Sequence, residues 1–295
     1  MNIAIVYFSQ TGQTRKVAEA MAAGLREKKH MVKVLAMQKV KPADIKSCDL
    51  LGVGSPCFES QAPGPVLTWL RAWPDLKGKS AFVFATAGGV PGRVLYDLTR
   101  ILRGRGARVI GGFMGRGMVH HPAPCLTGRL PNRPTAGDLE QARAFADAVD
   151  RHMQSGNAGA MPESRQDALK PTWGYFQLVS LIAKPFLLRI VLPKPKLTRS
   201  RCNQCQLCAK ECPADSITFS PFPVLDGHCI RCYHCQNICP EKALNESWWY
   251  GNLVIWFLYN TIFARLFGDL ITSRWKGHFL FPEHSVRLWL RVLLC

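Results

Sequence analysis

Cysteine is the residue type whose number and spacing could support the most chemistry in this chain. Of the 12 cysteines, eight lie between positions 202 and 239, in two runs. The first run, Cys-x2-Cys-x2-Cys-x3-Cys-Pro, starts at Cys202, and the same run starts again 27 residues later at Cys229. Closely spaced thiolates bind iron–sulfur clusters or zinc. Zinc ribbons usually use two separated Cys-x2-Cys pairs, so two triplets, each with a more distant fourth cysteine, favour iron–sulfur clusters over zinc.

The segment of roughly 197–244 resembles the bacterial ferredoxins that hold two [4Fe-4S] clusters, in which the fourth cysteine of each run ligates the other cluster. For the first cluster the resemblance implies the ligands Cys202, Cys205, Cys208 and Cys239. For the second it implies Cys229, Cys232, Cys235 and Cys212. Short strands are expected at 214–219 and after Pro240. The stretch 220–227 departs from the family pattern, and we expect a longer loop there, with a partner surface as the alternative.

A second group of residues with chemical potential is the polar loop 9–14, Ser-Gln-Thr-Gly-Gln-Thr. It follows an apolar run at 2–8 and precedes a helical pattern that places positions 17, 20, 21, 24 and 25 on one face. Hydroxyls and backbone amides at a helix N-terminus form a phosphate-binding cradle. The loop contains neither GxxxxGK[ST] nor GxGxxG, which argues against a nucleoside triphosphatase and a dinucleotide-binding fold.

The first half of the chain alternates between the periodicities of strands and helices. Strands are predicted at 2–8, 31–37, 50–55, 80–86 and 108–114. Besides the helix after the polar loop, helices are predicted at 66–73, 94–102 and 139–153. Such alternation predicts right-handed crossovers and an α/β fold with a doubly wound parallel sheet.

Within this half, Ser9-x-Thr11-Gly12-x-Thr14 resembles the phosphate loop of the flavodoxin family. The resemblance implies a flavodoxin-like sheet of order 2-1-3-4-5 that binds FMN at the carboxyl ends of the first, third and fourth strands. The implied phosphate-binding residues are Ser9, Thr11, Gly12, Gln13 and Thr14. The implied ring-contacting residues are Ser55, Pro56, Cys57 and Phe58 on one side, and Thr86, Ala87, Gly88 and Gly89 on the other. The alternatives are a flavodoxin-like fold that has lost its flavin and a Phe58 that belongs to the core.

Two adjacent histidines, His120 and His121, follow the last predicted strand of this sheet. Histidine titrates near neutral pH, so either could supply a proton beside a flavin. These two are the candidate catalytic residues. The alternative is that they are surface histidines with no role.

Length and composition limit the class of protein. A chain of 295 residues accommodates two domains, and its 47% hydrophobic content is enough to bury a core, which excludes a disordered tail or a coiled coil. The net charge of +18 suggests an acidic partner, an anionic membrane face or an anionic substrate. Nucleic acid is disfavoured as a partner because no recognised nucleic-acid-binding motif is present.

We divide the chain into a flavodoxin-like domain (1–155), a linker with an apolar helical segment (156–196), a two-cluster ferredoxin-like domain (197–245) and an aromatic-rich helical extension (246–295). The extension is expected to form helices that cover the first domain, with peripheral membrane contact or a homo-oligomer interface as alternatives. No secretory signal pattern is visible at the start of the sequence, and reduced thiolates favour the cytoplasm, with association with the inner face of the membrane as a variant.

Together the two resemblances identify the chain as similar to the flavodoxin–ferredoxin fusion family. This implies an iron–sulfur flavoprotein oxidoreductase that moves electrons between two [4Fe-4S] clusters and FMN. In one version FMN reduces or oxidises a small-molecule substrate. In the other the protein is an adapter that relays electrons to a partner protein or a membrane quinone. The expected partner is a low-potential electron donor or acceptor such as an acidic ferredoxin. A cluster-based sensor that binds nucleic acid is a third alternative, supported only by net charge.

Overall fold

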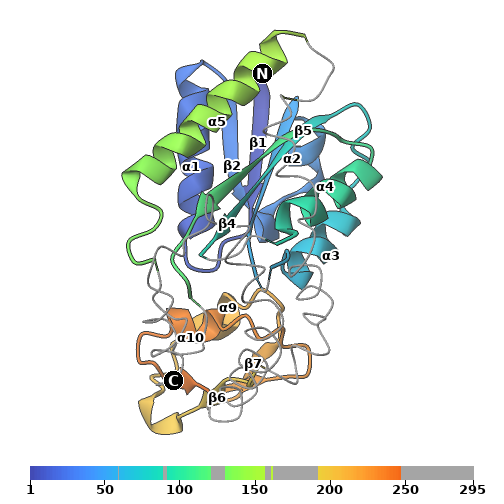
Figure 1. The fold of residues 1–295 in the computed structure, drawn as a ribbon. Coiled ribbons are helices and arrows are strands. Elements are labelled where there is room, and N and C mark those ends of the chain that lie inside the picture. The colour runs from blue at the N-terminus through green and yellow to red at the C-terminus, as the bar shows by residue number, and fades with distance from the viewer. Residues whose placement is uncertain (59, 89–91, 121–129, 157–160, 162–191, 247–295) are drawn as a thin grey trace, which may run out of the picture.

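The computed structural model describes residues 1–58, 60–88, 92–120, 130–156, 161 and 192–246. Figure 1 shows an α/β domain with a small cysteine-rich module at the carboxyl ends of its strands. The strands of the α/β domain are β1 (Asn2–Tyr7), β2 (Met31–Ala36), β3 (Leu50–Pro56), β4 (Ser80–Ala87) and β5 (Arg108–Arg116). Its helices are α1 (Gln13–Glu27), α2 (Pro42–Lys46), α3 (Gly64–Ala72), α4 (Val94–Gly104) and α5 (Ala136–Gln154), with a 3-10 turn at Met37–Lys39.

The five strands form a parallel sheet in the order β2-β1-β3-β4-β5. This confirms the predicted doubly wound, flavodoxin-like sheet. Helix α5 begins three residues before its predicted start, because Thr135 and Asp138 form a capping box that the hydrophobic pattern does not reveal. Helix α2 was not predicted, since its five residues are too few to show a helical period.

Helices cover both faces of the sheet: α1 and α5 lie on one face, and α2, α3 and α4 lie on the other (Figure 1). On the first face, the fully buried rings of Phe82 and Phe84 project from β4, and Phe82 meets Phe145 of α5 edge to face. The neighbouring strand makes room for these rings with glycine. A Cβ added at Gly52 would lie 2.5 Å from the Phe82 ring, so the large side chain on β4 requires a residue without a side chain at this position of β3.

The cysteine-rich module is built from short pieces. Strand β6 (Lys196–Leu197) pairs with β9 (Leu244–Asn245), and β7 (Ile217–Phe219) pairs with β8 (Pro223–Leu225), both antiparallel. Two short helices, α9 (Leu207–Lys210) and α10 (His234–Ile238), and a 3-10 turn at Arg199–Arg201 complete it.

The prediction of a longer loop at 220–227 is wrong, because this stretch contains β8 and closes a hairpin with β7. Its prolines suggested a loop, but Pro223 is the first residue of the strand. A missing N–H is tolerated at that position.

Several predictions lie outside the described residues. They concern Gly89, His121, most of the 156–196 segment and nearly all of the C-terminal extension from 246. Within the part of the chain that the structure describes, no helix has both the length and the apolar character needed to cross a bilayer.

Candidate functional site

The polar loop between β1 and α1 ends in a bare helix N-terminus. Gly12 is the N-cap residue, with a φ of 82°, and no side chain caps the helix. The first turn of α1 contains no acidic residue, and Arg15 and Lys16 stand there instead. Arg15 is ion-paired with Glu19 at 2.7 Å. The N–H groups of the first turn, the positive end of the helix dipole and the Lys16 cation together create an electropositive site that suits an anion.

The hydroxyl of Ser9 adds a polar atom to this site. Its oxygen is buried and has no hydrogen-bond partner among the described residues. A buried hydroxyl without a partner costs free energy, so its presence in this loop fits a ligand that supplies the missing contact. A phosphate group matches both the hydroxyl and the bare helix end. Thr11 lies in the same loop, half-buried.

The next two predicted phosphate-binding residues are tied to other elements of the domain. The Thr14 hydroxyl is buried and lies 2.8 Å from the Thr86 hydroxyl at the end of β4. The Gln13 amide nitrogen lies 2.6 Å from Nε2 of His120. These contacts bring the start of α1, the end of β4 and the segment after β5 together, although the residues are 72 and 107 positions apart.

His120 is therefore held beside the polar loop. Burial lowers the pKa of His120, which favours the neutral ring. A neutral ring accepts at Nε2 from the Gln13 amide and carries its proton on Nδ1. The candidate proton donor is thus in place next to the loop, but it is uncharged at neutral pH.

Hydrogen bonds hold the described residues at the end of β3 and directly after it. The buried Ser55 hydroxyl donates to the carbonyl of Pro56 at 2.9 Å, and the Cys57 amide donates to the carbonyl of Thr86 at 2.9 Å. Phe58 and Gln61 exchange two backbone hydrogen bonds. Cys57 and Phe58 both pack against the core, half-buried, so the core role considered for Phe58 is present in the structure.

The loop after β4 is crossed closely by the segment after β5. Ala87 is buried and its carbonyl accepts from the Gly117 amide at 3.0 Å. A Cβ added at Gly88 would lie 2.8 Å from the Gly117 carbonyl oxygen. Gly88 is therefore required by this close backbone approach. The contacts of all these loop residues with a flavin stay predictions.

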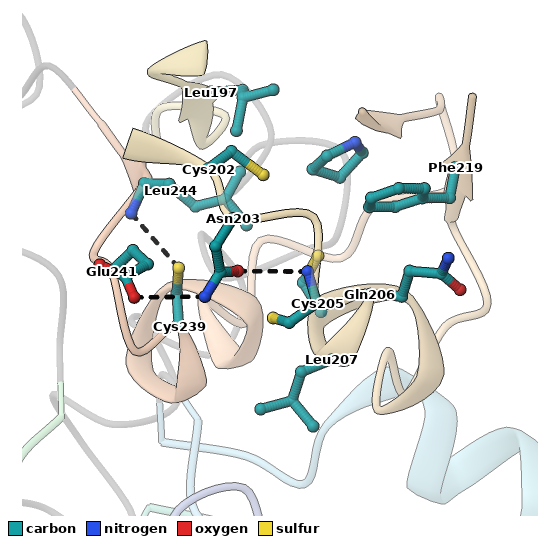
Figure 2. A pocket seen from close by; sticks show the side chains of 13 residues that line it. Leu197, Cys202, Asn203, Cys205, Gln206, Leu207, Phe219, Cys239, Glu241 and Leu244 are labelled. Atoms are coloured by element: carbon teal, nitrogen blue, oxygen red, sulfur yellow. Dashed lines mark hydrogen bonds between the residues drawn. The ribbon is translucent and has the colours of Figure 1, made fainter. Parts of the chain in front are cut away.

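The eight clustered cysteines line two separate pockets of similar size, about 330 and 310 Å³ including space open to solvent. The first pocket contains Cys202, Cys205, Cys208 and Cys239. The second contains Cys212, Cys229, Cys232 and Cys235. Figure 2 shows Cys202, Cys205 and Cys239 of the first set around this pocket. Each pocket thus holds three cysteines of one run and the fourth of the other, as in the ligand sets implied by the sequence; ligation itself stays a prediction.

The backbone around the two sets repeats as the sequence does. Three residues of the first copy of the 27-residue repeat have positive φ angles: Gln204 (59°), Gln206 (60°) and Asp215 (46°). Positive φ angles recur 27 positions later, at Arg231 (55°), Tyr233 (56°) and Lys242 (47°). Left-handed conformations at non-glycine residues are costly, and alternating them with ordinary ones turns successive N–H groups into an anion-binding concavity of the kind found at iron–sulfur sites.

Two thiols of the second set, Cys232 and Cys235, have raised pKa values. Burial, reinforced by Cys212 and Cys229, raises the pKa of Cys232 to about 12. Burial also raises the pKa of Cys235 and of Cys208 in the first set. These thiols stay protonated at neutral pH until a cation takes the place of the proton.

Within the described residues, no three His, Cys, Asp or Glu side chains converge closely enough to hold a single metal ion. Tetrahedral zinc would need four sulfur atoms about 2.3 Å from one point. The sulfur atoms instead surround two pockets, and the donor set of four soft thiolates per pocket fits a larger iron–sulfur group.

One residue of the polar loop was not predicted to matter. The Gln10 side-chain amide donates to the backbone carbonyl of Cys232. Gln10 was visible as a polar residue in the loop, but no local signal indicates a contact 222 positions away.

Residues 4–94 match the family model of the flavodoxin domain. An uncharacterized protein of Methanocaldococcus jannaschii is 32% identical over 59 residues, which are 20% of this chain and 23% of that protein. The chain therefore matches less than a quarter of the length of this curated relative.

Among solved structures, a flavodoxin from the domain Archaea is 22% identical, with a TM-score of 0.42, and the match covers 52% of this chain and 99% of that one. Oxidised flavodoxin 1 from Bacillus cereus is 21% identical, with a TM-score of 0.40 and coverage of 52% and 99%. Rubredoxin oxygen:oxidoreductase from Desulfovibrio gigas is 20% identical, with a TM-score of 0.42 and coverage of 54% and 37%. The fold assignment rests on the strand order itself.

Proposed function

We propose that this protein is an iron–sulfur flavoprotein oxidoreductase that moves electrons between two [4Fe-4S] clusters and FMN. The observation that carries the proposal is the sorting of eight cysteines into two pockets, each with the fourth cysteine of the other run. A residue of the second pocket, Cys232, contacts the polar loop of a flavodoxin-like sheet. When bound, FMN supplies one- and two-electron chemistry and each cluster supplies single-electron transfer.

The chain's own residues would position these groups. Ser9, Thr11 and the amides of Gly12 and Gln13 would hold the phosphate, with Lys16 adding positive charge. The loops 55–58 and 86–89 would border the ring. In the module, the amide of Ala243 donates to Cys239 Sγ at 3.3 Å, and a hydrogen bond to a ligand sulfur tunes a cluster's potential.

Analysis of the anaerobically purified chain tests the proposal. We expect about eight irons and about eight sulfides per chain, together with one FMN at most. Cys235→Ser should lose about half of the iron, whereas Cys48→Ala, which changes a buried core cysteine outside both runs, should keep all of it. A colourless protein without acid-labile sulfide and without flavin, even after reconstitution, would overturn the proposal.

The second part of the proposal is that the protein acts on a small-molecule substrate. The position of His120 supports this part, since the neutral His120 ring lies beside the polar loop. Reduced protein would be mixed anaerobically with a panel of organic oxidants. A true substrate should reoxidise it at least about tenfold faster than buffer does, and His120→Phe should slow that step. If no compound does so, the protein acts as an adapter that relays electrons to another protein or a quinone.

The electron partner we propose is an acidic ferredoxin, supported by the net charge of +18. Its rate of electron exchange with the protein should fall steeply between low and high salt, because association of oppositely charged proteins is screened. A salt-independent rate would remove this partner class.

A further inference from the structure

The two cysteine sets differ in their surroundings although they are copies in sequence and backbone. In the first copy, residues 204–207 are all exposed, and Leu207 is 37% exposed. The equivalent residues of the second copy, 231–234, are covered: Tyr233 is 3% and His234 is 9% exposed. The equivalent loop is therefore exposed to solvent in the first copy and covered by protein in the second.

The polar loop of the α/β domain is part of what covers the second copy. Gln10 is itself 9% exposed, and its side-chain amide donates to the Cys232 carbonyl. Figure 1 shows α10, which begins at His234, and α9 next to each other below the carboxyl end of the sheet. Between described residues, the hydrogen bonds of the first copy stay inside the module, where the amide of Cys205 donates to Asn203 and Asn203 donates to Glu241 (Figure 2).

Building on the proposed function, we propose that the second cysteine set is the inner one and that Gln10 couples it to the FMN phosphate loop. Gln10 is a positioning residue: it touches the loop that holds Cys232 and shares a chain segment with Ser9 and Thr11. When the second set is ordered, the position of the Cys232 carbonyl is fixed. The hydrogen bond to this carbonyl fixes the Gln10 side chain, and Gln10 in turn keeps the phosphate loop in the conformation that binds FMN. The first set has no such link to the polar loop among the described residues.

Coupling of this kind is reciprocal, so loss of the second set weakens FMN binding and loss of FMN loosens the second set. A buried amide left without its partner carries a penalty in addition to the lost bond. We therefore expect about a five- to tenfold change in the dissociation constant of FMN, at the lower end of typical coupling factors.

A double-mutant cycle on the full, anaerobically loaded chain tests the inference, with FMN affinity read from the quenching of flavin fluorescence and iron counted in parallel. Cys229→Ala removes a ligand of the second set, and Cys202→Ala, 27 positions earlier, is its matched control in the first. We expect Cys229→Ala to weaken FMN binding about five- to tenfold and Cys202→Ala to change it less than about twofold. In the Gln10→Ala background the effect of Cys229→Ala should disappear. Equal effects of the two cysteine variants, or an effect of Cys229→Ala that survives in Gln10→Ala, would overturn the inference.

If either cysteine variant loses all of its iron, the single variant Gln10→Ala decides. It should keep its full iron content and bind FMN about five- to tenfold more weakly, and the isosteric Gln10→Glu, which cannot donate to a carbonyl, should behave in the same way. Unchanged FMN affinity in both would refute the coupling. A wild-type chain that binds no FMN, or no iron, refutes the proposed function instead, so the two failures are distinguishable.

Discussion

Replacing the Ser9 hydroxyl should change protein stability and FMN affinity in opposite directions. In the FMN-free chain this oxygen is buried without a hydrogen-bond partner among the described residues. Ser9→Ala removes a desolvated polar atom and leaves the backbone of the loop intact. The same substitution removes a donor that we place on a phosphate oxygen.

The magnitudes follow from the two environments. Relief of an unsatisfied buried hydroxyl should raise the free energy of unfolding of the FMN-free chain by about 1 kcal/mol. A hydrogen bond to a charged group is worth about 1.5–3 kcal/mol, so FMN affinity should fall roughly ten- to 150-fold.

Urea unfolding of the FMN-free chain and fluorescence titration with FMN measure the two effects. Thr99 provides a matched control, because its hydroxyl is also buried without a partner among the described residues, but in helix α4, away from the polar loop. Thr99→Val should stabilise the chain to a similar extent and leave FMN affinity unchanged. The reasoning fails if Ser9→Ala keeps FMN affinity within about twofold, or if Thr99→Val weakens it equally.

Three further outcomes are expected. Gly54→Ala forces a Cβ into the Phe84 ring and should lower the urea midpoint by an amount equivalent to about 1–3 kcal/mol. The control Gly64→Ala, at an open position at the start of α3, should leave the midpoint unchanged. Equal midpoints for the two variants would contradict this reasoning. Burial works to raise the pKa of Asp138, but hydrogen bonds from Arg133 and Thr135 outweigh burial and hold that pKa below its usual range. The contribution of this carboxylate to stability is therefore present above about pH 4 and is lost as pH falls through the folded-state pKa. Asp138→Asn should reduce the dependence of the free energy of unfolding on pH in that window. Burial lowers the pKa of both His120 and His234, so the unfolded chain binds more protons below about pH 6.5 and stability should rise with pH up to that value. His120→Gln should reduce this slope, and a slope that does not change would show that His120 does not contribute to it.

The alternating pattern of the first half was sufficient to predict every strand of the parallel sheet, because buried strands and amphipathic helices differ in local periodicity. Short elements were missed for the same reason: α2 spans five residues and β8 spans three, less than is needed to show a period. The 27-residue repeat was predictable, and it recurs in the positive φ angles of Gln206 and Tyr233.

The candidate site was predictable as far as motifs reach. Spacing predicted two runs of four cysteines and a polar loop at a helix N-terminus, since both are set by residues close in sequence. The exchange of the fourth cysteine between the two groups was implied by the resemblance to two-cluster ferredoxins. The contact of Gln13 with His120 was not predictable, because it joins residues 107 positions apart whose types carry no pairing preference.

What the sequence by itself determined is the inventory: which thiols, hydroxyls and glycines are available, and which strands and helices carry them. Only the tertiary structure decided that two copies of one cysteine loop are unequal, with 204–207 exposed and Tyr233 and His234 buried. The physical reason is that burial and hydrogen bonding depend on what packs against a residue. The Gln10 contact with Cys232 exists only once the sheet and the module meet.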